Sequence, residues 1–225
     1  MDPIPLILLA GMGADERVFS PQREAFPQLT VQRWIPPQPN ESLPAYAARF
    51  ARQIDPGGPC FVGGASFGGF VAIEMARHLQ ARGVFLIGSC RSPCELPLRI
   101  RMLRKIRSAA SWMPFEPVCE LAGVGAIVCA RLPVSRTRSL LRQLADADAR
   151  FLRWACRAVL EWEQPSPPLD VPVHHIHGRR DHVLPVGRTR ADVIVEGAGH
   201  VLSLSHARDV NAFLRERMEH RSLFP

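Results

Sequence analysis

Residues that could carry out acyl transfer stand in three glycine-containing stretches of the chain. The first stretch, Gly64-Ala65-Ser66-Phe67-Gly68, follows an apolar run at 59–64 and begins a helical pattern at 67–81. A Gly-x-Ser-x-Gly between a strand and a helix forms a sharp turn that projects the serine hydroxyl outward. The pattern predicts that Ser66 is a nucleophile. In the alternative interpretation, the small residues only allow close packing of the strand and the helix.

A serine hydroxyl is a weak nucleophile that needs a base, and the base needs an acid to orient it. Asp181 follows the apolar run at 171–178, and His200 follows the run at 191–197 in a glycine-flanked loop. The carboxyl ends of parallel strands meet at one edge of a sheet. We therefore expect Ser66, Asp181 and His200 to meet there as nucleophile, acid and base.

Three other residues compete for these roles. His206 lies six positions after His200, and we expect it inside the last helix as a surface or packing residue. Glu95 is an alternative acid, but it lies well beyond the end of its strand. His182 adjoins Asp181, where it is either an ordinary loop residue or part of the pocket wall.

Three neighbouring histidines, His174, His175 and His177, raise the question of a metal site. On a strand, His175 and His177 share one face and His174 faces away, so the three cannot converge on one ion. No acidic or cysteine ligands cluster with them in the sequence. We expect no metal and no cofactor.

The elements that must position these residues alternate between strand and helix. Apolar runs typical of buried strands occupy 4–9, 31–35, 59–64, 83–88, 171–178 and 191–197. Helical patterns occupy 43–54, 67–81 and roughly 203–218, with Gly83 at the expected C-cap of the second. The alternation predicts an α/β fold with a mostly parallel central sheet of about six strands, flanked by helices.

The alternation stops between residues 91 and 164. This stretch has no convincing strand and reads as three or four helices separated by prolines. We expect 91–164 to form a helical lid inserted into a core made of 1–90 and 165–225. Ligands of open α/β sheets bind at the carboxyl ends of the strands, so the lid would cover that edge.

The serine turn, followed in order by Asp181 and His200, resembles a small member of the α/β-hydrolase superfamily. The resemblance covers nearly the whole chain except the insertion, and it implies that two N-terminal strands common in that family are missing. It also implies an oxyanion hole formed by the backbone N–H groups of Met12 and Phe67. Ala10 stands where many relatives have a histidine in this loop.

The same resemblance implies the activity. The chain is similar to small carboxylesterases, including pimeloyl-carrier methyl-ester esterases, and to stand-alone thioesterases. It implies hydrolysis of a carboxylic ester through an acyl-enzyme intermediate. The alternatives are a thioesterase acting on acyl-CoA or acyl-carrier protein, a cofactor-free perhydrolase or lyase, and a non-hydrolytic ligand receptor.

Substrate contacts are expected from the loop and the lid. The residues proposed to bind substrate are Gly11, Trp112, Phe115 and Trp154, although packing within the lid also explains such aromatic residues. The segment 99–108 alternates Ile and Leu with Arg and Lys. It is either a docking surface for an acidic carrier protein, a CoA tail or an anionic membrane, or a solvated basic face.

Composition restricts the class of protein. A chain of 225 residues with 47% hydrophobic and 22% charged residues is typical of one soluble globular domain. The N-terminal apolar run is too short for a signal peptide, and no stretch reaches the roughly 18 residues that span a bilayer. The six cysteines are expected to be reduced. We expect a cytoplasmic protein. The net charge of +7 comes almost entirely from arginine, and such a bias is weak evidence for binding to nucleic acid, so we expect no nucleic-acid partner.

Overall fold

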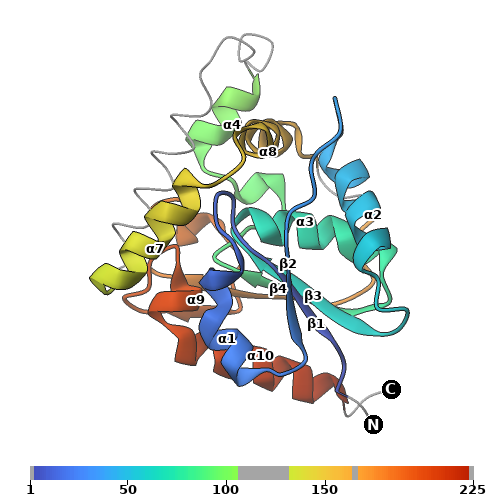
Figure 1. Ribbon diagram of the computed structural model, residues 1–225, viewed down its shortest axis with the longest axis vertical. Coiled ribbons are helices and arrows are strands. Elements are labelled where there is room, and N and C mark those ends of the chain that lie inside the picture. The colour runs from blue at the N-terminus through green and yellow to red at the C-terminus, as the bar shows by residue number, and fades with distance from the viewer. Residues whose placement is uncertain (1–2, 106–131, 164–166, 223–225) are drawn as a thin grey trace.

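The chain forms a six-stranded sheet, and the computed structural model describes residues 3–105, 132–163 and 167–222 (Figure 1). The strands lie in the order β2-β1-β3-β4-β5-β6, and every pair is parallel. Their bounds are Leu6–Leu9, Leu29–Gln32, Cys60–Ala65, Ala81–Ile87, Val173–Gly178 and Val193–Val195 for β1 to β6. The predicted α/β fold with a parallel sheet is confirmed.

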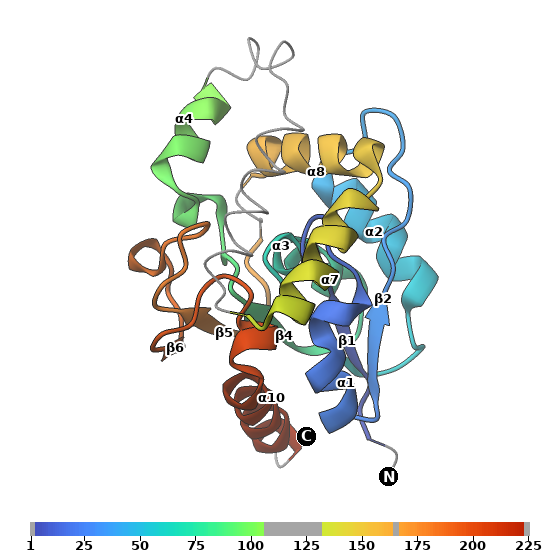
Figure 2. The ribbon, with the colours of Figure 1, turned by 60° about the vertical axis from the view of Figure 1, so that its left-hand side comes forward.

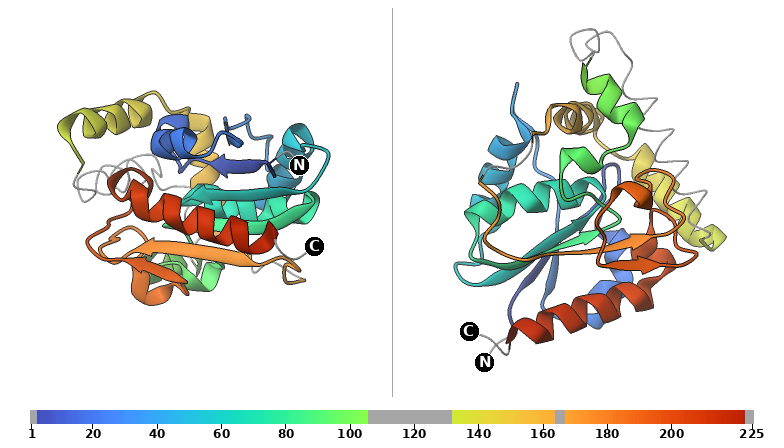
Figure 3. Two further views of the ribbon diagram at one scale, coloured as in Figure 1. Left: turned by 90° about the horizontal axis from the view of Figure 1, so that it is seen from below. Right: turned by 180° about the vertical axis from the view of Figure 1, so that it is seen from behind.

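Helices cover both faces of the sheet (Figure 3). The first face carries α2 (Leu43–Ile54) and α3 (Phe67–Met75), and the second carries α1 (Ser20–Ala25), α9 (Leu202–Ser205) and α10 (Ala207–Ser222). Alternate residues of β1 enter the two cores: Ile7 and Leu9 pack on the first side, Leu6 and Leu8 on the second. A strand covered on both faces is therefore apolar along its whole length.

Short 3₁₀ turns connect several of these elements. They are η1 (Glu16–Phe19), η2 (Ala76–His78), η3 (Pro93–Glu95) and η4 (Val186–Arg188). In η1 the Asp15 side chain accepts the backbone N–H of Arg17 as an N-cap.

The described part of the inserted segment is largely helical and contains no strand. It contains α4 (Leu98–Lys105), α7 (Val134–Ala145) and α8 (Ala149–Glu161); α4 and α8 lie at the upper end of the molecule in Figure 2, and α7 lies below α8. A methyl group on Gly13 would touch Leu144 of α7 and Leu152 of α8, so these helices pack on the loop after β1. The domain bounds at 91 and 164 stay a prediction.

A buried contact fastens the end of α8 to the sheet domain. Trp162 stacks on Phe70 of α3 at 4.8 Å between ring centroids, and its Nε1–H donates to Glu74 Oε1 at 2.8 Å. Burial raises the pKa of the Glu74 carboxyl, and the hydrogen bond from Trp162 opposes that rise. The inserted segment thus shares a core with α3 rather than forming a separate one.

Three predicted boundaries are wrong. The second strand ends at Gln32 rather than at residue 35, because Trp34 leaves the sheet and stacks on Phe151. Gly83 does not cap a helix: it lies inside β4 and pairs with Phe61, because pairing with β3 extends the strand back to residue 81. The last helix is split, and His206 occupies the break between α9 and α10.

The cysteines divide into two groups. Cys60 and Cys90 are free and buried, and Cys94 is free and exposed. Cys156 of α8 is disulfide-bonded, so the prediction that all six cysteines are reduced is wrong at this residue. Pairing depends on which side chains folding brings together, and spacing along the chain does not reveal it.

Within the described ranges, no helix is both long enough and apolar enough to cross a bilayer.

The Trp162–Glu74 hydrogen bond should stabilise the attachment of α8. Trp162→Phe keeps a ring on Phe70 but leaves Oε1 of the buried Glu74 carboxyl without its donor, so we expect a loss of about 1–3 kcal/mol in the free energy of unfolding. Urea titration at pH 7 measures it. Trp154→Phe is the matched control, because that indole donates to the Glu41 carbonyl at a partly buried position. Equal losses in both variants would contradict the expectation.

Candidate active site

The turn between β3 and α3 holds Ser66 in a strained conformation. Its φ of 51° lies in the left-handed region that serine rarely adopts. A side chain on Gly64 would overlap the backbone of Gly68, and one on Gly68 would overlap the carbonyl groups of Leu9 and Ala10. The close packing of the alternative interpretation is therefore present, and it occurs together with a strained serine.

Hydrogen bonds on both sides hold this strained residue in place. The Ser66 N–H donates to the Ile87 carbonyl at 3.1 Å. The Ser66 carbonyl accepts the N–H of Gly69 at 3.0 Å and the hydroxyl of Ser89 at 2.7 Å. Ser89 is fully buried after β4, and no pattern in the sequence pointed to it. A methyl group on Gly69 would overlap the Ser89 hydroxyl, which explains the second glycine after the turn.

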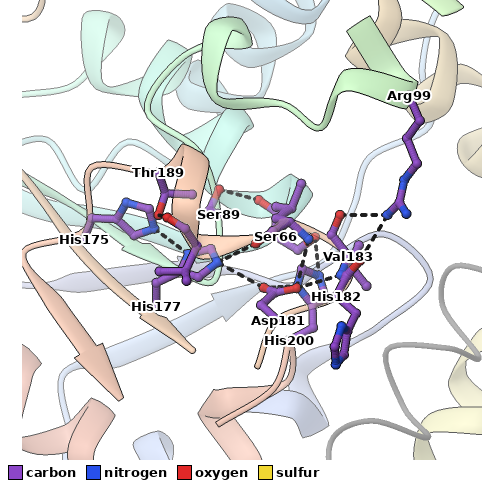
Figure 4. Close-up of polar contacts among 12 residues, drawn as sticks. Ser66, Ser89, Arg99, His175, His177, Asp181, His182, Val183, Thr189 and His200 are labelled. Atoms are coloured by element: carbon purple, nitrogen blue, oxygen red, sulfur yellow. Dashed lines mark hydrogen bonds and ion pairs between the residues drawn. The ribbon is translucent and has the colours of Figure 1, made fainter. Parts of the chain in front are cut away.

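Ser66, His200 and Asp181 form an unbroken chain of short contacts (Figure 4). His200 Nε2 lies 2.9 Å from Ser66 Oγ, and His200 Nδ1 lies 2.7 Å from Asp181 Oδ2. The other carboxylate oxygen, Oδ1, accepts the backbone N–H groups of Val183 and Leu184, each at 2.8 Å. Ser66, Asp181 and His200 follow β3, β5 and β6, so the structure brings the three predicted residues together at one edge of the sheet.

The Asp181 carboxyl is buried and ionised. Burial opposes its ionisation most strongly, yet the charge of His200 and hydrogen bonds from His177 and His200 outweigh burial and hold the pKa well below its ordinary value. A carboxylate only accepts hydrogen bonds, so His200 Nδ1 carries the proton. His200 Nε2 is then free to accept the proton of Ser66 Oγ.

The resemblance implies an oxyanion site formed by the backbone N–H groups of Met12 and Phe67 beside Ser66. Phe67 is the first residue of α3, and N–H groups in the first turn of a helix have no intrahelical partner. The N–H of Met12 also has no partner within the described part of the chain. The residue before Met12 lies close to the turn, since a Cβ on Gly11 would lie 3.6 Å from the Ser66 Cβ. Oxyanion binding by Met12 and Phe67 stays a prediction.

Comparison with known proteins identifies the family. The model of the alpha/beta hydrolase family matches residues 6–213, most of the chain. The chain belongs to the alpha/beta hydrolase family. A search of proteins of curated function found no match to this hydrolase.

Solved structures of the same fold resemble this hydrolase at low sequence identity. A thermophilic esterase from Thermogutta terrifontis, solved with malate bound, is 18% identical with a TM-score of 0.73, over 97% of this chain and 90% of that one. MenH from S. aureus is 15% identical with a TM-score of 0.73, over 99% and 96%. An N-acyl homoserine lactonase in complex with N-hexanoyl homoserine lactone is 17% identical with a TM-score of 0.70, over 100% and 93%. At these identities the likeness establishes the fold.

The competing residues lie apart from the Ser66–His200 contact in this hydrolase. His206 is not inside a helix as predicted, and its Nδ1 lies 2.9 Å from the hydroxyl of the preceding serine. His182 is exposed, and its ring points away from Ser66 (Figure 4). Glu95 is buried and accepts the backbone N–H groups of Arg91 and Arg190, so it joins the loops after β4 and β5.

The β5 histidines of the hydrolase divide between the two faces of the sheet. His175 and His177 share a face as predicted, and their rings are hydrogen-bonded at 2.9 Å. His174 stacks on Phe85 on the other face. Among the described residues, no three His, Cys, Asp or Glu side chains could hold a metal ion. Sequence reasoning missed that His177 contacts Asp181. The signal was the place of His177 at the end of β5, just before residues 179–185, the loop that carries Asp181 (the acid loop).

Four residues were predicted to contact substrate, and the structure describes two of them, Gly11 and Trp154. Trp112 and Phe115 lie outside the described residues. Trp154 donates its Nε1–H to the Glu41 carbonyl at 2.8 Å, and its ring lies 4.2 Å from Tyr46 and 5.9 Å from Phe67, measured between centroids. Its polar edge is thus occupied and its ring is packed. Substrate contact by Gly11 and Trp154 stays a prediction.

A hollow of about 190 Å³ lies beside the loop after β1 in the hydrolase. Its wall is formed by this loop, the segment after β2 and the junction of α7 and α8. Trp34, Ile35 and Phe151 supply apolar surface, and Asp146 and Asp148 supply carboxylates. The hollow is therefore mixed in character rather than a purely apolar acyl pocket.

The basic segment of α4 contacts the acid loop. Arg99 donates through its Nη2 to the carbonyl groups of His182 and Val183, each at 3.1 Å (Figure 4). At least one of its arginines therefore has a partner within the hydrolase. Docking of a carrier protein, CoA or membrane on this segment stays a prediction.

Substitutions at Gly69 and Ser89 should have coupled effects on the free energy of unfolding. Gly69→Ala would favour a helix, but the new methyl group would overlap the Ser89 hydroxyl, so we expect a net loss of about 1–3 kcal/mol in unfolding free energy. In a Ser89→Gly background the same substitution should cost less, because the overlapping group is gone. Urea unfolding of the four proteins in this cycle measures the coupling. Strict additivity would contradict the expectation.

Proposed function

We propose that this hydrolase cleaves a carboxylic ester through an acyl-enzyme intermediate, with Ser66, His200 and Asp181 as a catalytic triad. The observation that carries the proposal is the chain of contacts at 2.9 and 2.7 Å from Ser66 Oγ through His200 to Asp181. Such a chain matches the geometry of nucleophile, base and orienting acid. Membership of the alpha/beta hydrolase family supports a hydrolytic reaction.

Acylation begins with proton transfer from Ser66 Oγ to His200 Nε2. The oxygen attacks the ester carbonyl, and the carbonyl oxygen becomes an oxyanion. The N–H groups of Met12 and Phe67 are proposed to bind this oxyanion, since they are oriented before charge develops. His200 then gives its proton to the departing alkoxide, which leaves as an alcohol and yields acyl-Ser66.

Deacylation repeats these steps with water. His200 Nε2 takes a proton from water, whose oxygen attacks the acyl carbonyl and releases the acid from Ser66. The proton returns to Ser66 Oγ, so one ester and one water become one acid and one alcohol. Asp181 stays ionised throughout, because it stabilises the imidazolium of His200 without taking its proton.

We propose a small-molecule ester, and a thioester is the second class that the same chemistry would cleave. A panel of p-nitrophenyl esters of increasing acyl length, together with acyl-CoA thioesters, compares the two classes. Faster turnover of every thioester than of its matched ester would overturn the assignment to esters.

Removal of the nucleophile or the base should abolish activity. We expect Ser66→Ala and His200→Ala to lower ester hydrolysis by at least about 10³-fold with the fold intact, and Ser66→Ala to abolish labelling by a fluorophosphonate. His206→Ala is the matched control, because that histidine lies six residues further on and its ring is hydrogen-bonded to Ser205 rather than to Ser66 or Asp181. It should keep wild-type activity.

Two results would overturn the proposed serine hydrolase activity. If it hydrolyses no ester or thioester in the panel and Ser66 is not labelled, the chain is not a serine hydrolase. If Ser66→Ala retains full activity, another residue is the nucleophile.

The depressed pKa of Asp181 predicts a pH dependence of stability. A carboxyl whose pKa is lower in the folded state stabilises the protein above its unfolded pKa of about 3.9, and this contribution is lost as the pH falls below that value. We expect the unfolding free energy of wild type to fall more between pH 5 and 3 than that of Asp181→Asn. Asp181→Asn should also lower kcat by about 10⁴-fold. Parallel stability curves for the two proteins would contradict the first expectation.

A further inference from the structure

Two buried histidines continue the contact chain behind Asp181. His177 Nε2 lies 3.2 Å from Asp181 Oδ2 and 2.7 Å from the Leu184 carbonyl oxygen. His177 Nδ1 lies 2.9 Å from His175 Nε2, and both histidine side chains are inaccessible to solvent. The opposite nitrogen, His175 Nδ1, is buried without a partner among the described residues (Figure 4). The chain thus runs from Ser66 Oγ to a closed end inside β5.

The partners of His177 assign its protons. A carbonyl oxygen only accepts, so the Nε2 that lies against Leu184 carries hydrogen and is shared with the Asp181 carboxylate. In neutral His177, Nδ1 is then bare and accepts from His175 Nε2–H. If His177 were charged instead, His175 would carry an unpaired, buried N–H at Nδ1, which is costly. The neutral arrangement leaves only a bare acceptor there.

Each hydrogen-bond donor around Asp181 is then assigned to one of the two carboxylate oxygens. Oδ1 accepts two backbone N–H groups from the acid loop, and Oδ2 accepts His200 Nδ1–H and His177 Nε2–H. The two histidines approach Oδ2 from β5 and from the loop after β6. His177 therefore restrains the one carboxylate oxygen that orients His200.

Burial keeps His175, at the closed end of this chain, neutral. Burial, with a smaller contribution from His177, lowers the pKa of His175 to about 2, and the charges of Arg91 and Asp181 act on it in opposite directions. Arg91 is paired with Asp192 at 2.8 Å. Burial also raises the pKa of the Cys90 thiol well above its ordinary value. Proton transfer during catalysis is then confined to His200, beside an Asp181 that stays ionised.

We propose that His177 is a positioning residue that holds Asp181 through its Nε2–H, and that His175 keeps His177 in the tautomer that donates there. The inference rests on the proposed function, since it assigns to His177 and His175 a role in orienting the triad. His177 restrains Asp181, Asp181 restrains the ring of His200, and His200 presents Nε2 to Ser66.

The experiment compares two substitutions at residue 177. His177→Leu removes the donor, and we expect kcat to fall by about 10- to 100-fold with KM within about twofold, as for loss of a hydrogen bond to a charged group. The acidic limb of kcat/KM should also move up, because an Asp181 carboxylate with one donor fewer attracts the imidazolium of His200 more strongly. His177→Gln places an amide N–H near the same position and should restore most of both quantities.

The same logic applies at residue 175 with a smaller effect. His175→Leu leaves His177 Nδ1 without a donor, so the alternative tautomer becomes populated, and we expect a threefold to tenfold fall in kcat. His174→Leu is the matched control: it lies on the same strand but on the opposite face, against Phe85. It should keep the wild-type pH profile.

Two outcomes overturn the proposal. The first is a His177→Leu protein whose kcat and pH profile match wild type. The second is a His177→Gln protein as impaired as His177→Leu, which would show that ring volume rather than the N–H matters. Thermal unfolding of each variant identifies any that fail to fold.

Nitrogen-15 NMR of histidine-labelled wild type tests the chain without activity or mutation. We expect His177 and His175 to be protonated at Nε2 and bare at Nδ1, and His200 to be protonated at Nδ1. Protonation of His177 at Nδ1 alone would overturn the proposal even where variants are unstable. An inactive wild type with the expected nitrogen pattern would instead overturn the proposed function and leave the hydrogen-bonded chain established.

Discussion

The strained backbone of Ser66 is the constraint on which the site depends. β3 ends in the middle of the sheet, and α3 must start at once and pack back against it. Gly64 and Gly68 bring the backbones of strand and helix into direct contact. The chain reverses its direction at Ser66, which has a positive φ. Buried hydrogen bonds to Ile87, Gly69 and Ser89 hold that conformation. The turn costs stability locally, and the central position of β3 supplies the packing that offsets it.

A second constraint is the burial of the Asp181 carboxylate. A buried charge is tolerated only where its hydrogen-bonding capacity is filled, so the acid loop folds around the carboxyl group. Val183 and Leu184 turn their N–H groups toward one oxygen, and the Leu184 carbonyl turns toward His177. The loop, the end of β5 and His200 are therefore one polar network inside an apolar shell. Its donors set both the ionisation of Asp181 and the orientation of His200.

The described part of the inserted segment is joined to the same framework by aromatic packing. Phe151 and Trp154 of α8 lie against Phe67, whose backbone N–H stands beside Ser66. Trp34 stacks on Phe151 and Trp162 stacks on Phe70, so α8 rests on the first turns of α3. Arg99 connects α4 to the acid loop. The covering helices and the residues around Ser66 are thus parts of one packed structure.

The sequence alone determined the strand–helix alternation, the position of α2 at 43–54, and the three residues that meet at the sheet edge. These follow from short-range signals: apolar runs, helical spacing, and glycines beside Ser66 and His200. Only the tertiary structure decided that Gly83 pairs within β4, that Cys156 is disulfide-bonded, and that Ser89 and His177 support the turn and the acid. The reason is physical: each of these depends on a partner far along the chain, and only folding brings such partners within hydrogen-bonding distance.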